Sequence, residues 1–341
     1  MHARILSQET IYGATEVSAD VWDGTANIKW YLDGPNADGA YELNSAEDLA
    51  GLAFIVGSSH AESRYVGVYY RADGTVAGYA SGTKDTGFRD LSLICTDPDG
   101  LESVSGDNFM GKKVVLNVDV VLNEGNAADW ETTAPANLWQ PIGGNYPDGA
   151  KMTSFTGTFD GQGHTISGLY YKAAANYVAG GLFGWVSSKF PAAFKNLTLD
   201  NFYVEGEVVS GLLGRTNGQV TVDNVMLTNG TVKNAGSQTG AFIGGVFEGP
   251  AVFRYCGVEN VAVCGNKYVG FFAGVAVGQE ISVTDCYVKD SSATGDAEVG
   301  VLSGRMMGGS ISIQNLYVIA ELEATSTNID SADFTPSAGV V

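Results

Sequence analysis

A five-residue frame that closes on glycine recurs through the second half of the chain. The copies read GGLFG, SGLLG, GAFIG, GFFAG and GVLSG, and their closing glycines are Gly184, Gly214, Gly244, Gly274 and Gly304. Each interval between these glycines is 30 residues. A constant period of this size indicates a repeat architecture, in which each repeat is one structural unit that buries its apolar face against its neighbours. The glycines are therefore predicted to be structural and to form one column.

Short alternating apolar stretches lie between the glycine frames at nearly the same period. They cover residues 196–199, 224–227, 256–258, 286–288 and 316–318. Their β-branched composition favours strands, and a propeller blade would need about 40 residues. The expected fold is all-β: a single-stranded parallel β-helix, or solenoid, with about 30 residues per coil and strands stacked about 4.8 Å apart. Parallel crossovers are overwhelmingly right-handed, so that hand is expected.

The composition fits frequent tight turns and a strongly acidic surface. The chain has 46 glycines and 8 prolines in 341 residues, and its formal net charge is −20. That charge repels a phosphate backbone or an anionic membrane, which argues against nucleic acid as a partner. No apolar run is long enough to span a bilayer, so no membrane insertion is expected. The carboxylates are expected to keep a glycine-rich protein soluble, with Ca²⁺ binding by some of them as the alternative.

The four cysteines are Cys95, Cys256, Cys264 and Cys286. Cys256 and Cys286 differ by one period, so they should stack on neighbouring coils. Strands about 4.8 Å apart do not bring Cβ atoms to the roughly 3.8 Å of a disulfide, so buried free thiols are predicted. Cys95 and Cys264 are interpreted as buried apolar fillers. No zinc site is expected, because no C-x-x-C pair is present.

The clearest helical pattern precedes the repeats. Ser45 and Asp48 form a capping-box pattern, and apolar residues follow at helical spacing at Leu49, Leu52 and Val56. An open solenoid end exposes unpaired strands and an apolar interior, so this helix is predicted to be the N-terminal cap.

The chain is accordingly divided into five parts. They are an extended N-terminal arm (1–40), a strand and capping α-helix (41–56), a small inserted β-hairpin subdomain (57–107), the parallel β-helix (108–320) and a C-terminal tail or cap (321–341). Asp-Gly turns at Asp73 and Asp99 indicate antiparallel hairpins in the insertion. The insertion is a candidate contact region, because excursions from a regular scaffold commonly carry specificity; an inert flap is the alternative.

Several longer motifs follow one another in order. They are WDGT at 22–25, GKKVVLNVDV at 111–120, WQPIG at 139–143 and FTGTFDGQGHTISGL at 155–169. Together with the GLFG coils, this series resembles the GLUG-motif family of bacterial surface β-helix proteins. The resemblance implies a secreted, cell-wall or outer-surface module and no catalytic residues, because the motif is structural. The chain departs from the family pattern at 57–107, where the helix usually runs quickly into the Gly-Lys strand.

The residue pattern gives little support to catalysis. Glycoside hydrolysis needs two carboxylates about 5–9 Å apart. The aspartates of the repeats instead occur singly and are interpreted as turn or asparagine-ladder residues: Asp160, Asp200, Asp223 and Asp285. His164 is interpreted as a structural corner residue. Residues 96–100 (TDPDG) are interpreted as a turn with Ca²⁺ as the alternative, so no catalytic residue, metal ligand or cofactor is predicted.

Aromatic residues outside the repeat register are the candidate binding residues. Planar rings on a rigid face suit sugar stacking or protein contact. The candidates are Tyr69, Tyr70, Trp130, Tyr170 and Tyr171. The alternative interpretation is that these rings seal the first coils.

The leading hypothesis is a non-catalytic, adhesin-like surface module that presents the solenoid and the insertion to a surface glycan or protein receptor. It could act as a homo-oligomer or within a larger assembly, at an extracellular or cell-surface location. A bacteriophage virion component (tail, fibre or capsid decoration) is the first alternative, because residues 1–20 lack the apolar core of a secretory signal. A polysaccharide lyase or hydrolase is the second, because parallel β-helices often process polysaccharides.

Overall fold

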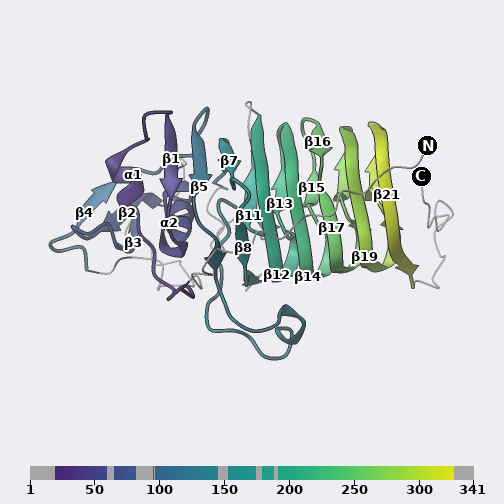
Figure 1. The fold of residues 1–341 in the computed structure, drawn as a ribbon, viewed down its shortest axis with the longest axis horizontal. Coiled ribbons are helices and arrows are strands. Elements are labelled where there is room, and N and C mark those ends of the chain that lie inside the picture. Colours follow the sequence, from purple (N-terminus) through teal and green to yellow (C-terminus); the bar gives the residue numbers. More distant parts are fainter. Residues whose placement is uncertain are drawn as a thin grey trace, which may run out of the picture.

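The computed structural model describes residues 20–59, 65–81, 95, 97–144, 153–173, 179–187 and 191–325. These residues form an elongated stack of parallel coils with a mixed α/β cap at the N-terminal end (Figure 1). The predicted all-β parallel solenoid is confirmed. In this part of the chain, no helix is both long and apolar enough to cross a membrane.

Each complete coil contributes one long bent strand and one short strand. The long strands are β12 (Ala192–Ser210), β14 (Val220–Gly240), β19 (Glu280–Gly300) and β21 (Ser310–Ala324), and one coil divides its long strand into β16 (Ala251–Arg254) and β17 (Gly257–Gly270). The short strands form a separate five-stranded parallel sheet: β11 (Phe183–Val186), β13 (Leu213–Thr216), β15 (Ile243–Val246), β18 (Ala273–Val277) and β20 (Ser303–Met307). The first coils use shorter strands in the large sheet: β5 (Lys113–Leu116), β6 (Val120–Val121), β7 (Thr158–Asp160), β8 (Thr165–Ser167), β9 (Tyr170–Lys172) and β10 (Ala179–Gly180).

The closing glycines lie in one column of the short-strand sheet. The residues that flank them pair in register from coil to coil, from Phe183 and Leu213 through Ile243 and Ala273 to Ser303. A Cβ atom added at Gly244 would lie 2.5 Å from the carbonyl oxygen of Gly214 and 3.1 Å from the amide nitrogen of Val209. Glycine is required at this column because the backbones of successive coils approach too closely for any side chain.

Two further columns mark the corners of the long strands. One contains Asn196, Asn224, Tyr255, Asp285 and Asn315, and the other contains Asn201, Asn229, Asn260 and Asp290. All nine residues have φ between 48° and 55°. Asparagine and aspartate tolerate this left-handed region better than other residues with a side chain, so their recurrence at the corners follows from the sharp bend. We call the second column the asparagine corner.

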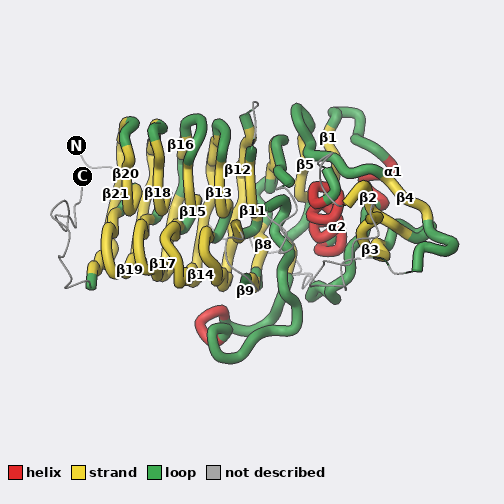
Figure 2. Tube along the Cα trace, turned by 180° about the vertical axis from the view of Figure 1, so that it is seen from behind, coloured by secondary structure: helices red, strands yellow, loops and turns green. Residues whose placement is uncertain are grey.

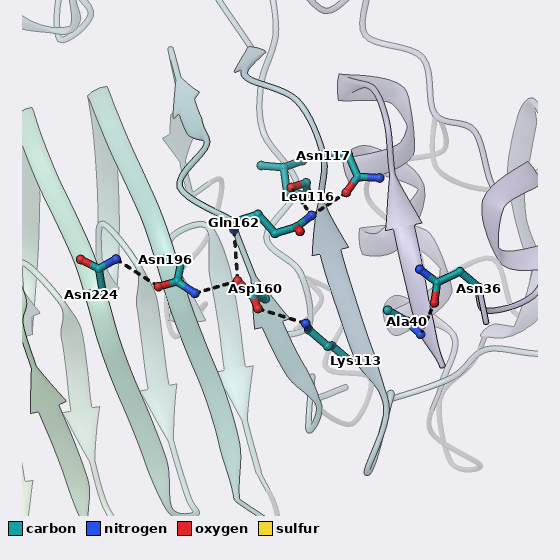
Figure 3. A network of polar contacts seen from close by, with 9 residues as sticks. All are labelled: Asn36, Ala40, Lys113, Leu116, Asn117, Asp160, Gln162, Asn196 and Asn224. Carbon is teal, nitrogen blue, oxygen red and sulfur yellow. Dashed lines mark hydrogen bonds and ion pairs between the residues drawn. The ribbon is translucent and has the colours of Figure 1, made fainter. Parts of the chain in front are cut away.

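Side chains of the first corner column form a polar ladder across the early coils (Figure 3). Asn224 donates to Asn196 at 3.0 Å, Asn196 donates to Asp160 at 3.0 Å, and Lys113 lies 3.1 Å from the second oxygen of Asp160. Burial alone would raise the pKa of Asp160, but hydrogen bonds from Asn196 and Gln162 and the charge of Lys113 hold it below its ordinary value. The expected ladder role of Asp160 is confirmed.

The coil interior is filled by the recurrent apolar side chains of the repeats. Phe183 and Phe194 pack with their ring centroids 4.5 Å apart, and Phe242, Phe253 and Phe272 form a second group at 5.1 to 5.6 Å. All five rings have no exposed surface. Burial of each such side chain contributes roughly 2 kcal/mol, so the ring stacks are a main source of the stability of the fold.

The solenoid begins earlier in the chain than predicted. β1 (Ala40–Leu43) pairs in parallel with β5, so it already belongs to the first coil. The following helix α2 (Ala46–Gly57) begins as predicted: Ser45 accepts from the amide of Asp48, and the Asp48 carboxylate accepts from the amide of Asn44. Nine of its twelve residues are buried, because the insertion covers its outer face.

The insertion folds as a small antiparallel sheet of β2 (Tyr65–Tyr70), β3 (Val76–Ser81) and β4 (Glu102–Val104). Phe54 of α2 packs against Tyr79 of β3 at 4.8 Å. The helix and the insertion therefore form one cap. Residues 82–94 of the predicted insertion lie outside the described residues.

Two further predictions, on the N-terminal arm and on the start of the tail, are wrong. Residues of the supposed extended arm form the helix α1 (Lys29–Asp33), and Trp30 is buried against Phe109 in the core. Burial of the large apolar Trp30 side chain stabilises this folded arrangement over an extended arm exposed to solvent. At the other end, β21 continues to Ala324, past the predicted start of the tail at 321; residues 326–341 lie outside the described residues.

The cysteines divide into two kinds. Cys256 and Cys286 are free and buried, and the amide of Cys256 lies 3.4 Å from Sγ of Cys286 on the next coil, so the predicted pair of stacked thiols is confirmed. Burial raises the pKa of the Cys256 thiol. Cys95 and Cys264 are partly exposed, so their interpretation as buried fillers is wrong.

Replacement of Gly244 by alanine should destabilise the protein by about 2 kcal/mol, because the added methyl group overpacks the backbone of the preceding coil. Urea unfolding followed by circular dichroism measures this change. Ser282→Ala, on the outer face of β19, is the matched control and should stay within about 0.5 kcal/mol of the parent. Equal stability of both variants would contradict a close-packed glycine column.

Asp160→Asn should cost about 1 kcal/mol at neutral pH, because the ion pair with Lys113 and part of the ladder are lost. The folded-state pKa of Asp160 lies below its unfolded value. Its contribution is therefore complete above a pH of about 4 and lost as the pH falls through the folded-state pKa. Urea unfolding at pH 7 and in stronger acid should show the difference between variant and parent shrinking with acidity. Asp38→Asn, at an exposed site, serves as the control.

Candidate ligand-binding groove

A groove of about 1120 Å³ lies along the asparagine corner. Its floor contains equivalent positions from five successive coils, so the groove runs in the direction in which the coils stack. Its lining residues are Val121, Asn123, Glu124, Gly125, Asn126, Ala128, Ser167, Asp200, Asn201, Asn229, Gly230, Thr231, Asn260, Val261, Ala262, Asp290, Ser291, Ser292, Ile319, Ala320 and Glu321.

The floor is held by a ladder of side-chain hydrogen bonds between coils. The Asn260 amide donates to the Asn229 carbonyl at 2.7 Å, and the Asn229 amide donates to Asp200 at 2.7 Å. Asp200 also accepts from the Thr228 hydroxyl at 2.6 Å. Each side-chain amide nitrogen carries two N–H groups, and the ladder uses one of them. The remaining N–H groups are available to a ligand on the groove floor.

One wall of the groove is a loop that leaves the solenoid after β6 and returns before Trp139. The loop carries the short 3-10 helix η2 (Ala127–Asp129), which projects from the lower edge of the coils in Figure 2. Its base is closed by Asn123, which accepts from the amide of Asn137 and donates to the carbonyl oxygens of Asn137 and Gly168. We call residues 123–137 the wall loop.

Asn201 connects the wall loop to the floor. Its side-chain amide donates to the carbonyl oxygen of Gly125 at 2.9 Å, and its side-chain oxygen accepts from the amide of Ala127 at 2.8 Å. Because Asn201 is also the first residue of the asparagine corner, wall and floor share one anchoring side chain.

Three aromatic side chains attach the wall loop to the coils. Trp130 meets Tyr170 edge-on at 6.1 Å, and Tyr170 stacks on Tyr203 at 5.8 Å. These rings form a small cluster with Ala127 that is separate from the main core. Glu131 forms an ion pair with Lys233 of β14. The wall is therefore fixed by apolar packing and by charge.

Polar and ionic contacts of Tyr203 also hold the ring cluster in place. Glu205 accepts from the Tyr203 hydroxyl at 2.6 Å and lies 2.8 Å from Lys172. Burial and the bond to Glu205 raise the pKa of Tyr203. Burial alone would raise the pKa of Glu205, but the bonds from Lys172 and Tyr203 hold it below its ordinary value. Tyr203 therefore stays a neutral hydrogen-bond donor.

The structure places the predicted binding rings mostly under other side chains. Tyr70, Trp130, Tyr170 and Tyr171 are all at most 9% exposed, so they offer a ligand almost no ring surface. Their burial matches the alternative interpretation, in which these rings seal the coils. Tyr69, on β2 at the far end of the molecule from β21, is partly exposed (Figure 1). Of these five residues, the structure brings Trp130 and Tyr170 into contact but does not gather all five at one site.

All ionisable side chains that line the groove are acidic. Its ionisable side chains are Glu124, Asp200, Asp290 and Glu321, and its lining contains no lysine, arginine, histidine or aromatic residue. Such a groove attracts cationic or neutral ligands and repels polyanions. Amide and carboxylate groups in rows can donate to and accept from hydroxyl groups.

Other candidate positions lie away from the groove. His164 is 3.1 Å from the Asp119 carboxylate, so it has a partner that the sequence did not reveal. In the TDPDG turn, the amide of Asp99 contacts Asp97. Among the described residues, no group of three His, Cys, Asp or Glu side chains is placed to hold a metal ion.

Sequence reasoning missed the asparagine corner as a site. A signal was present, because Asn201, Asn229 and Asn260 recur at 28 and 31 residues, close to the coil period. The wall loop carries no such periodic signal, since it occurs once.

The fold defines the class of the protein, a parallel β-helix with a capped N-terminal end. No protein-family model matches the chain, and no curated protein matches it. Among solved structures, a crystal structure described as a candidate immunoglobulin A1 protease from Bacteroides ovatus has a TM-score of 0.34 and 18% identity, over 67% of this chain and 76% of that chain. Similarity at this level adds nothing to the assignment of function. The resemblance to the GLUG-motif family stays a prediction.

Trp130→Ala should detach the wall loop while the coils stay folded, because the ring anchors the loop and is not part of the main core. Loss of a buried tryptophan typically costs about 3 kcal/mol, here of local stability. Amide hydrogen exchange should accelerate in residues 123–137 and stay unchanged in β14 and β19. Leu138→Ala, at a side chain that is 56% exposed, is the control. Unchanged exchange in the wall loop of Trp130→Ala would contradict this anchoring.

Proposed function

We propose that the chain is a non-catalytic, surface-displayed β-helix module that binds an extended glycan in the groove along the asparagine corner. The observation that carries this proposal is the groove itself, whose floor spans five coils and repeats the polar corner residue in four of them. Display at a cell surface is supported by the resemblance to surface β-helix modules and by the net charge of −20, which keeps a glycine-rich protein soluble.

The dimensions of the groove suit a chain ligand. Its volume of about 1120 Å³ lies just above the range of ordinary small-molecule sites, which extends to roughly 1,000 Å³. Five coils about 4.8 Å apart extend over roughly 19 Å, so several units of a linear ligand can lie along the floor. A rigid floor reduces the ordering cost of binding, because the polar groups are already in place.

The side chains favour a neutral or amine-bearing glycan over a polyuronate. Asparagine amides supply donors and acceptors for hydroxyl groups, and the four carboxylates accept hydrogen bonds or pair with ammonium groups. A polymer of uronic acids would place carboxylates against Asp200, Asp290 and Glu321. This repulsion gives the groove its selectivity.

The second candidate function is glycan cleavage, which the carboxylates of the groove favour. Hydrolysis would need one acid and one base or nucleophile across the scissile bond. Asp200 is engaged by Thr228 and Asn229 in the ladder, so a structural role already accounts for it. Binding without turnover is therefore the better-supported function.

Ala262→Trp should block the groove, because Ala262 lies on the groove floor and the ring would fill it. Calorimetric titration should show binding of a glucosamine oligomer or a neutral glucose oligomer to the parent protein, and at least tenfold weaker binding to the variant. A galacturonate oligomer should bind neither protein.

Val252→Trp is the matched control, since Val252 is partly exposed on the outer side of β16 and is not part of the groove. It should bind like the parent. Equal loss of binding in both tryptophan variants, or tight binding of the galacturonate oligomer, would overturn the proposed site. New reducing ends or unsaturated sugars in the same mixtures would establish the catalytic alternative.

A further inference from the structure

An apolar surface lies at the C-terminal end of the solenoid, and none of the residues that the structure describes covers it. β21 pairs with β19 along one edge, and among the described residues nothing pairs with its other edge. Half of the ten large hydrophobic residues that are exposed in the described structure lie on β20 and β21: Met307, Ile311, Ile313, Tyr317 and Ile319. A long free strand edge is a template for pairing with another chain.

The two ends of the molecule are different. Helix α2 and the antiparallel sheet of the insertion cover the first coil, whereas β21 is the last element at the opposite end (Figure 1). If copies stacked head to tail, β21 of one copy would therefore face the cap of the next copy and not a free strand edge. A contact between two C-terminal ends is the arrangement that joins free edge to free edge.

All inward-facing side chains of β21 are apolar. They lie in register with buried residues of β19, and they are Ile311, Ile313, Leu316, Val318, Ala320 and Leu322. Inside the stack such a row is covered by the next coil. On β21 the row continues the core, and no further coil covers it within residues 20–325 as far as they are described.

β21 is also nearly symmetric about Tyr317. The strand extends seven residues to either side, from 310 to 317 and from 317 to 324. It bends at Asn315, which has φ 55°, and again between Ile319 and Ala320, opposite the corner at Asp290. A second copy running antiparallel would therefore place each of its bends over a bend of the first.

We propose that two copies of this chain associate through β21 in an antiparallel, two-fold symmetric pair that joins the two solenoids end to end. Tyr317 lies opposite Tyr317 of the second copy, and Leu316 lies opposite Val318. Beyond the bends, with Asn315 as a bulge, Ile313 meets Ala320 and Ile311 meets Leu322. This register keeps every inward-facing residue opposite an inward-facing one, so the two apolar interiors become continuous.

The charges of β21 favour the antiparallel direction. The side chains of β21 that carry a charge at neutral pH are Glu321 and Glu323, both in the last third of the strand. In the proposed pair they lie opposite Ser312 and Ser310 of the second copy. A parallel pair in register would place each glutamate against its own equivalent, and like charges directly opposite are destabilising.

The inference is independent of the proposed glycan binding. It is argued from the strand edge and the inward row of β21, of which Ile319, Ala320 and Glu321 also line the last part of the groove. Ala262→Trp lies two coils away from β21 and tests glycan binding separately.

Opposite charges at Ser312 provide the test, because this exposed residue faces Glu321 of the second copy. Ser312→Glu adds two repulsive contacts per dimer and should raise the dimer dissociation constant on the order of tenfold. Ser312→Lys adds two attractive contacts per dimer and should leave the dimer dissociation constant at the value of the parent or lower it. Sedimentation equilibrium of the full chain measures both variants and the parent, and added salt should tighten the parent dimer by screening its net charge.

Three results would overturn the proposal. The parent could be monomeric from nanomolar to high-micromolar concentration. The two Ser312 variants could change association equally, which would contradict the antiparallel register. Finally, the β21 amides that point away from β19 could be protected from hydrogen exchange independently of concentration, in which case another part of the same chain covers the edge. Ile313→Asn is a second variant that should abolish the dimer, and circular dichroism would verify that its coils remain folded.

Discussion

The whole architecture depends on the close approach of successive backbones at the glycine column. Parallel strands pair at a constant spacing only if nothing separates the coils, and Gly214, Gly244 and Gly274 leave no room for a side chain. This contact sets the register of both sheets. Between the few bulges of the long strands the register is kept, so apolar positions stack on their equivalents and the corner asparagines come within hydrogen-bonding distance of one another. Core, corners and groove are therefore consequences of one steric condition.

Sequence reasoning recovered the features that repeat. The 30-residue interval predicted the parallel coils, the glycine column and the stacked thiols of Cys256 and Cys286, because a feature present in every coil must stack once the coils stack. The capping of α2 was also predictable, since Ser45 and Asp48 act within one helical turn. Local chemistry and strict periodicity are both visible in a single sequence.

Features that occur once were not predictable. Trp130 is 40 residues from Tyr170 and 73 from Tyr203 in the sequence, and no local pattern shows that these rings meet. The aromatic residues outside the repeat register were therefore interpreted as binding residues, although four of them are buried. Trp130 and Tyr170 fasten the wall loop to the coils, and Tyr70 and Tyr171 belong to the main core. The burial of Trp30 and of the outer face of α2 follows the same rule, since both depend on distant segments.

Because the coils have a constant length, the length of the groove can change without a change in the residues that line it. Equivalent residues of neighbouring coils have nearly the same environment, so a duplicated block such as 244–273 would insert as one more rung between unchanged neighbours. The floor would lengthen by about 4.8 Å with each added block, and neither the cap nor β21 would change. Evolution or design can thus adjust this protein to longer or shorter polymers by copying gene segments, without altering a single contact residue.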